Sequence, residues 1–168
     1  MVHNAYTMPF RWNLTVWAIT LGCTALCVAA FGAMIYCATV AHRIDYAVAG
    51  FVVFALLLAA IVLAEGYAPQ RLEVGDDGMV ILRRYRSIEI PRSEIVGIEP
   101  VATKYVLQSF RLGGSGGLFG FFGRHYSPRL GGFDLYATEF RNMMIIRTAR
   151  KTFIVGCTEP RALHERLG

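Results

Sequence analysis

The sequence predicts an α+β protein in which an N-terminal transmembrane hairpin of two helices precedes a small antiparallel β-barrel or sandwich. We expect this second part to contain about seven strands and to end in a helix. Three observations support the prediction: two long stretches without charged residues, a change to a basic composition near residue 71, and a series of short strand-like segments beyond it. They divide the 168 residues into an N-terminal segment (1–11), a helical hairpin (12–67) and a C-terminal domain (68–168).

The two apolar stretches run from Trp12 to Ala41 and from Tyr46 to Ala64, and neither contains Asp, Glu, Lys, Arg or His. A transmembrane helix needs about 20 mainly apolar residues to cross roughly 30 Å of hydrocarbon. A signal peptide is the rival interpretation of the first stretch, but its apolar core has only about 7–15 residues. Both stretches therefore predict membrane-spanning helices.

The short polar connection at residues 42–45 places both ends of the hairpin on one side of the membrane. Lys and Arg close to helix ends favour the cytoplasmic side. The end of the hairpin at which the chain enters and leaves it carries Arg11, Arg71, Arg83 and Arg84, whereas the connection between the helices carries only Arg43. We therefore expect both termini and the C-terminal domain to be cytoplasmic. Because the stretches hold no ionisable side chain of the kind that ion and proton pathways use, anchoring is their simplest role.

Residues 71–168 hold 15 of the 17 Lys and Arg and 10 of the 12 Asp and Glu, a formal charge of +5. Tight turns are predicted at Gly75–Gly78 and Thr148–Lys151. Thr158 can cap a final helix, in which Leu163 and Leu167 share one face. The strand-like segments are 71–74, 79–85, 87–91, 95–101, 133–138, 142–148 and 151–157, with 105–112 as a further candidate.

Residues 113–123 read GGSGGLFGFFG and are followed by GGFDLYATEFRNMMIIRT at residues 131–148. These two stretches resemble membrane-anchored bacterial proteins that carry a pleckstrin-homology-like (PH-like) domain. The resemblance implies a hydrophobic hairpin, a PH-like barrel and a C-terminal helix, in the bacterial cytoplasmic (inner) membrane. It implies a fold more than an activity. The residues that carry it are Gly114, Gly116, Gly117, Phe119, Gly120, Gly123, Gly132, Tyr136, Ala137 and Thr138.

The glycine-rich stretch matches neither the P-loop pattern nor the dinucleotide-binding pattern of glycines. We interpret five of its glycines as structural residues that route a long connection between strands: Gly114, Gly116, Gly117, Gly120 and Gly123. Its aromatic residues have two open interpretations. Phe119, Phe121 and Phe122 either seal the barrel, or form an exposed apolar tip that contacts lipid or protein, flanked by Arg111, Arg124 and Arg129.

A second basic cluster lies at residues 83–86. PH domains that bind phosphoinositides commonly carry a Lys in the first strand and an Arg-x-Arg pair in the second, around a basic loop. Arg84 and Arg86 fit the pair, but the loop at Gly75–Gly78 is acidic and the first strand offers Arg71 instead of Lys. This departure favours a general attraction to anionic headgroups over a specific inositol phosphate pocket. The other interpretation is a solvated, charged strand face.

No catalytic motif or metal-binding spacing is present, and no cofactor is expected. Cys23, Cys27, Cys37 and Cys157 are interpreted as packing residues. The predicted function is non-enzymatic: a membrane-anchored binding or scaffold protein that presents its domain to a protein partner or to anionic lipid. Self-association through the phenylalanine stretch is a variant of this hypothesis, and nucleic acid is not an expected partner. The alternative is an accessory subunit of a membrane transporter or enzyme complex.

Overall fold

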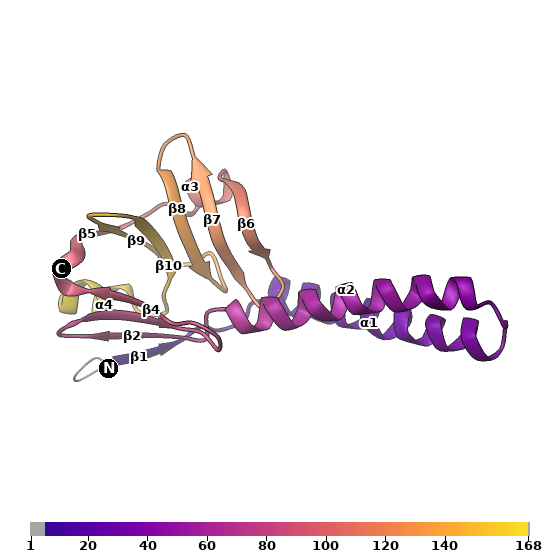
Figure 1. Cartoon of the computed structure of the whole chain (residues 1–168). Helices are drawn as coiled ribbons and strands as arrows, with labels where there is room; N and C mark the ends of the chain where they lie inside the picture. Colours follow the sequence, from indigo (N-terminus) through magenta and orange to yellow (C-terminus); the bar gives the residue numbers. More distant parts are fainter. Residues whose placement is uncertain (1–5, 168) are drawn as a thin grey trace.

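The computed structural model describes residues 6–167 and shows a long helical hairpin that projects from a β-rich domain (Figure 1). The first helix, α1, spans Leu14–Thr39, and the second, α2, spans Ile44–Tyr67. Asn13 caps α1, because its side-chain oxygen accepts a hydrogen bond of 2.9 Å from the Val16 amide. The two helices predicted from the uncharged stretches are thus confirmed.

Both helices are long and apolar enough to cross a membrane, judged by length and composition. Large apolar side chains remain exposed along both of them, among them Leu21, Phe31 and Leu56. An apolar surface of this extent normally needs lipid or protein to cover it. The hairpin therefore supports membrane association of the chain.

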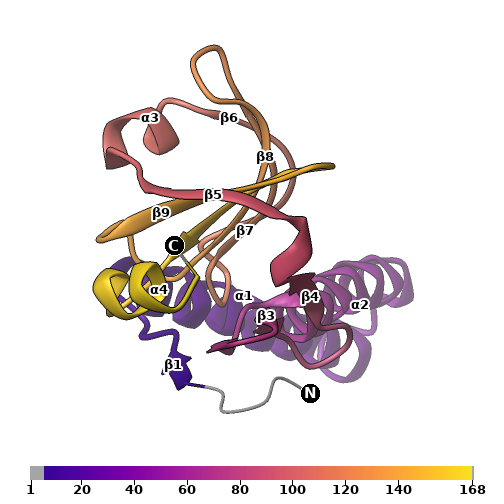
Figure 2. The same ribbon diagram turned by 90° about the vertical axis from the view of Figure 1, so that its left-hand side faces the viewer.

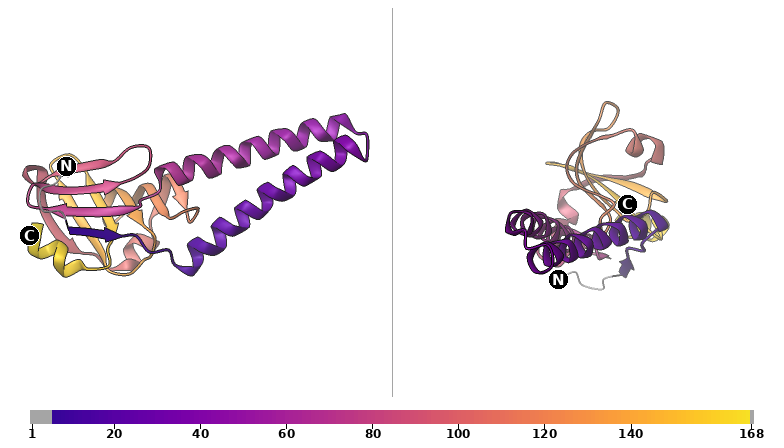
Figure 3. Two further views of the ribbon diagram at one scale, coloured as in Figure 1. Left: turned by 90° about the horizontal axis from the view of Figure 1, so that it is seen from below. Right: turned by 90° about the vertical axis from the view of Figure 1, so that its right-hand side faces the viewer.

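The four-stranded sheet adjoins the hairpin and is antiparallel, with the strand order β1-β2-β3-β4. Strand β1 precedes α1 in the sequence and pairs with β2, which follows α2. The hairpin is therefore inserted between two neighbouring strands of one sheet, as the view from below shows (Figure 3). The strands are β1 (Tyr6–Pro9), β2 (Arg71–Gly75), β3 (Gly78–Leu82) and β4 (Ile88–Pro91).

The six-stranded sheet has the order β5-β9-β10-β8-β7-β6 and curves around the short helix α3 (Figure 2). Its strands are β5 (Ile95–Pro100), β6 (Phe110–Gly116), β7 (Phe121–Ser127), β8 (Gly131–Ala137), β9 (Met143–Thr148) and β10 (Thr152–Gly156). The helical elements of the domain are the 3-10 turn η1 (Arg92–Glu94), α3 (Thr103–Leu107) and α4 (Pro160–Leu167).

The predicted antiparallel barrel needs correction in three respects. Within residues 6–167 there are ten strands, where about seven were expected. The sheets are open, because β5 and β6 form the two edges of the larger sheet and do not pair with each other. One neighbouring pair, β8 and β10, is parallel. The sequence pattern showed strand segments but not which segments are neighbours, and therefore it did not predict an open sheet or a parallel pair.

Two hydrophobic cores hold the domain together. The first includes residues of both sheets and Leu163 and Leu167 of α4, which confirms the predicted amphipathic helix at the end of the chain. The second lies on the other face of the larger sheet, where Val106 of α3 packs with Phe133 and Leu135 of β8. Because both faces of the larger sheet are partly covered, its central strands β9 and β10 are almost entirely buried.

Candidate functional site

The glycine-rich stretch forms a β-hairpin, in which β6 ends, the chain turns tightly and β7 begins. Gly114 and Gly123 face each other across this hairpin with φ values of 110° and 121°. A Cβ atom at either position would overlap the backbone of the opposite strand. Glycine is therefore required here both by the positive φ and by the close approach of the two strands.

The turn of this hairpin packs against the first turns of α1. The Phe119 amide donates a hydrogen bond of 3.1 Å to Oγ1 of Thr20, and the Phe119 ring lies 5.7 Å from the Trp12 ring. Gly117 is buried against the Ile19 side chain, leaving no room for a side chain of its own. The larger sheet is thus fixed directly to the hairpin at the end of α1 that adjoins the domain.

The phenylalanine and remaining glycine residues of the stretch are mostly drawn inward. Phe122 is buried in the first core, and Phe121 packs against Phe140 of the second core with a ring distance of 4.5 Å. Gly120 is buried near Ala137 and Thr138, and Gly116 lies beneath the Arg111 guanidinium. Phe119 differs from the other two rings in contacting Trp12, directly before α1.

Strand register brings a second set of residues to the end of the domain from which the helices emerge. Pro9 pairs with Arg71, and Arg71 pairs with Leu82, so the end of β1, the start of β2 and the end of β3 lie together. The five arginines at or beside these strand ends are named here the arginine collar: Arg11, Arg71, Arg83, Arg84 and Arg86. The opposite ends of β2 and β3 meet at the exposed turn of Asp76 and Asp77.

Contacts with the end of α2 hold part of the arginine collar in place. Arg84 forms an ion pair of 2.8 Å with Glu65 of α2, although the Arg84 side chain remains 61% exposed. The Arg83 guanidinium lies over the rings of Tyr67 and Tyr136, at 5.6 and 5.7 Å from their centres. Cation–π contacts of this kind hold a guanidinium in place while leaving its positive charge unneutralised.

The other three arginines of the sequence-based prediction lie on or beside β6 and β7 of the larger sheet, whereas the collar lies at strand ends of the smaller sheet. Arg129 donates a hydrogen bond of 3.1 Å to the Tyr105 hydroxyl, beside α3. Arg111 covers Gly116 on β6. Arg124 lines a small polar pocket of about 80 Å³ together with Arg150, Lys151 and Asp134. The predicted arginines therefore do not form one site.

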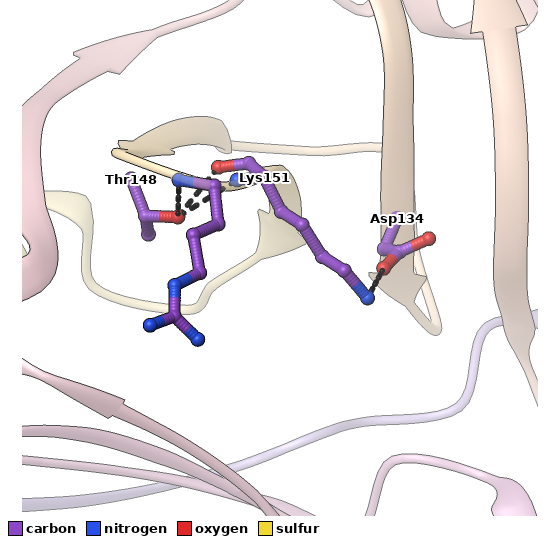
Figure 4. Close-up of polar contacts among 4 residues, drawn as sticks. Asp134, Thr148 and Lys151 are labelled. Atoms are coloured by element: carbon purple, nitrogen blue, oxygen red, sulfur yellow. Dashed lines mark hydrogen bonds and ion pairs between the residues drawn. The ribbon is translucent and has the colours of Figure 1, made fainter.

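Figure 4 shows part of this polar pocket, where the Lys151 side chain extends from the β9–β10 turn towards Asp134, at a distance of 3.8 Å. The Thr148 hydroxyl stabilises the turn by accepting hydrogen bonds from the amides of Arg150 and Lys151. These contacts confirm the turn predicted at Thr148–Lys151. The carboxylate of Asp134 already offsets part of the positive charge in the pocket.

An exposed apolar group lies on and beside the edge strand β6, and the sequence analysis did not identify it. Phe110 and Leu112 of β6 are 67% and 66% exposed. Leu107 of α3 and Tyr126 of β7 are exposed nearby. The sequence predicted a strand over 105–112, but residues 105–107 belong to the helix α3 and the strand β6 begins at Phe110. Only the strand order shows that β6 is a sheet edge without a neighbour on one side.

The buried titratable groups of the domain are uncharged in character. Burial raises the pKa of the Cys157 thiol to about 11. Burial lowers the pKa of His125, because it disfavours the charged imidazolium, whereas the hydrogen bond with the Gly123 carbonyl acts in the opposite direction. Among residues 6–167, no three His, Cys, Asp or Glu side chains come together in a way that could hold a metal ion.

The sequence model of a family described as the bacterial PH domain matches residues 70–168, more than half of the chain. The chain belongs to the bacterial PH domain family. The match to the bacterial PH domain begins at Gln70, directly before β2, so that β1 and the helical hairpin lie outside it. A search of curated proteins finds no match, and neither does a search of solved structures. PH domains are generally non-catalytic modules that bind lipids or proteins.

Proposed function

We propose that this chain is a non-enzymatic binding protein of the bacterial cytoplasmic membrane, whose hairpin holds the PH domain at the cytoplasmic surface against anionic lipid. The observation that carries the proposal is the arginine collar, which lies beside the place where α1 and α2 enter the domain. Each Lys or Arg close to an anionic leaflet adds about 1 kcal/mol of attraction. The collar thus sits at the depth where lipid headgroups would lie if the helices span the bilayer.

The charge distribution along the smaller sheet supports the same orientation. Its end near the helices carries the collar, and the turn at its other end carries Asp76 and Asp77. Five residues of strand separate these ends, a distance of about 17 Å. Since the leaflet repels carboxylates and attracts guanidinium groups, this gradient favours an upright domain with its acidic turn directed away from the membrane.

The experiment uses the two tryptophans, Trp12 and Trp17, which lie beside the collar at the start of α1. Full-length protein is placed in vesicles with a trace of dansyl-labelled phosphatidylglycerol or dansyl-labelled phosphatidylcholine. Energy transfer from tryptophan to dansyl reports which lipid gathers around the collar. We expect stronger transfer to phosphatidylglycerol, and we expect salt to weaken the difference because it screens exposed charges.

The matched variants carry the same change in net charge. Arg71→Gln with Arg86→Gln removes two collar charges and should reduce the preference for phosphatidylglycerol roughly tenfold or more. Arg147→Gln with Arg161→Gln removes two exposed arginines of β9 and α4 and should leave the preference intact. Equal transfer to both lipids in the unmodified protein, or an equal loss in both double variants, would contradict the proposal.

Binding of a protein partner is the second candidate function, and the exposed group on β6 favours it. An edge strand with unpaired backbone groups can accept a strand from another protein. Phe110 and Leu112 would supply apolar contacts beside such a strand. Crosslinking in native membranes distinguishes this candidate from lipid binding, because it requires adducts with another protein at β6 or along the helices. The accessory-subunit alternative requires such adducts as well.

A further inference from the structure

An apolar groove runs between the last turns of α2 and the β6–β7 hairpin, where this hairpin meets the helices in Figure 1. Its volume is about 390 Å³, within the range of about 300–1,000 Å³ that is typical of ligand sites. The lining residues are Ala60, Leu63, Ala64 and Tyr67 on the α2 side, and Gly114, Ser115, Leu118 and Phe122 on the hairpin side.

Small residues contribute to both walls of the groove. Ala60 and Ala64 on α2 and Gly114 and Ser115 on β6 are small residues, and they leave space between the larger lining side chains of Leu63, Tyr67, Leu118 and Phe122. Gly114 has to remain glycine, since its positive φ and its approach to β7 exclude a larger residue. The absence of a side chain at this point of the wall is therefore a consequence of the hairpin geometry described above.

The chemistry of the walls favours an apolar occupant. The Ser115 hydroxyl, one of the few polar groups in the lining, already donates a hydrogen bond of 2.8 Å to the Leu118 carbonyl. Ala60 and Leu63 belong to a helix that is apolar enough to span a membrane, and both are exposed. If α2 crosses the bilayer, the groove is open to the acyl region of the leaflet next to the domain.

The positively charged side chain of Arg83 lies beside both walls of the groove. The Arg83 guanidinium lies 5.6 Å from the ring of Tyr67, which lines the groove on α2. It also lies 5.7 Å from the ring of Tyr136, whose residue pairs with Phe122 of the other wall. An anionic group at the mouth of the groove would therefore meet a positive charge that these rings hold in position.

We propose that this groove binds a single anionic phospholipid, with one acyl chain between α2 and the β6–β7 hairpin and the phosphate at Arg83. The proposal rests on the proposed function, because it requires α2 to lie in the bilayer with the domain at its surface. It goes further by assigning a defined lipid site in place of a diffuse attraction. The site would also make the contact between the larger sheet and α2 dependent on lipid.

The experiment is photochemical crosslinking in vesicles that contain full-length protein and phosphatidylglycerol with a diazirine near the middle of one acyl chain. Trypsin cleaves after Arg111 and Arg124, so the whole hairpin wall is released as the peptide 112–124. We expect this peptide to carry the lipid label. Phosphatidylcholine with the same acyl chain should label it less, because its headgroup has no net negative charge for Arg83 to attract.

Ala60→Trp fills the groove from the helix side and should lower labelling of peptide 112–124 roughly tenfold, as expected from overpacking an occupied site. Ala59→Trp is the matched control, since Ala59 is an exposed neighbour on α2 that does not line the groove. Leu63→Trp provides a second filling variant from the same wall. Thermal unfolding of each variant verifies that the domain remains folded.

Two results would contradict a lipid site in the groove while leaving the proposed function intact. In the first, peptide 112–124 stays unlabelled although tryptophan-to-dansyl transfer still reports enrichment of phosphatidylglycerol. In the second, Ala59→Trp and Ala60→Trp reduce labelling equally, which indicates general contact with the bilayer. Adducts of this peptide with another protein in native membranes, in place of lipid, would assign the groove to a partner helix. Labelling without any preference for phosphatidylglycerol would contradict the role of Arg83 and the collar together.

Discussion

At the scale of single residues, the His125 imidazole couples the stability of the domain to pH. His125 is 8% exposed, stacks on Phe133 at a ring distance of 5.7 Å and lies with Nδ1 3.1 Å from the Gly123 carbonyl oxygen. Nδ1 must therefore carry the proton that it donates to this carbonyl. Burial is the main reason why the pKa of His125 lies below its usual value of 6.5, and the nearby Arg111 charge acts in the same direction.

The lowered pKa predicts a loss of stability in acid. Below pH 6.5 the unfolded chain binds a proton that the folded chain does not, so the free energy of unfolding decreases as pH falls from this value towards the lowered pKa. The slope contributed by one group is at most about 1.4 kcal/mol per pH unit. Thermal unfolding of full-length protein in detergent between about pH 7.5 and pH 5.5 measures it.

His125→Phe keeps an aromatic ring in the core and should flatten this pH dependence. His164→Gln, at an exposed position on α4, should leave it unchanged. If the unmodified protein and His125→Phe lost stability equally on acidification, then a group other than His125 would be responsible.

At the scale of secondary structure elements, β1 is the short strand that ties the N-terminal side of the hairpin to the domain. Its Met8 side chain is 3% exposed and belongs to the first core, whereas Thr7 beside it is exposed. Met8→Ala should therefore reduce the free energy of unfolding by about 2–4 kcal/mol, because it removes buried apolar atoms and leaves a cavity. Thr7→Ala should change it by less than about 0.5 kcal/mol.

Denaturant unfolding of both variants, followed in full-length protein, measures the contribution of β1. Similar values for Met8→Ala and Thr7→Ala would show that β1 does not pack stably on the sheet. In that case α1 would be connected to the domain only through the β6–β7 turn and through α2.

Elements with strong local signals were predictable from the sequence, and elements defined by distant partners were not. The apolar stretches located α1 and α2, and Gly75–Gly78 located the β2–β3 turn. Strand β1 has only four residues, and its partner β2 follows the whole hairpin. Strand β7 was missed because the glycine-rich stretch in which it begins suggested a loop, although Gly123 in fact permits close strand pairing.

The candidate site shows the same division. The sequence identified the basic cluster at residues 83–86, and the strand register then placed Arg11 and Arg71 of other segments beside it. The groove had no sequence signal of its own, since its walls come from a helix and a hairpin that lie about 50 residues apart. Its shape depends on how the β6–β7 turn packs on α1, which is a tertiary contact.

At the scale of the whole molecule, both helices are fixed at their domain ends by the same sheet. β1 leads into α1, and α2 leads into β2, with the Phe10 amide hydrogen-bonded to the Gln70 carbonyl at 3.2 Å. The contact between Phe119 and Thr20 adds a third connection. The domain therefore has little freedom to swing away from the helix ends, which keeps the arginine collar at one depth.

This rigid arrangement predicts the topology of the chain in the membrane. The α1–α2 connection lies at the far end of the hairpin from the domain, and its Arg43 is paired with Asp45 at 2.9 Å, whereas the domain end carries the collar.

Basic residues favour the cytoplasmic side, so His42→Cys should react with a membrane-impermeant maleimide in intact spheroplasts. Tyr126→Cys, on the exposed surface of the domain, should react only after permeabilisation. The unmodified chain, which contains Cys23, Cys27, Cys37 and Cys157, gives the background labelling. Cys157 adds little to it, because it is buried and its pKa is raised to about 11, so that little thiolate is present at neutral pH. Labelling of position 126 in intact spheroplasts, with position 42 protected, would reverse the orientation and remove the collar from the cytoplasmic leaflet.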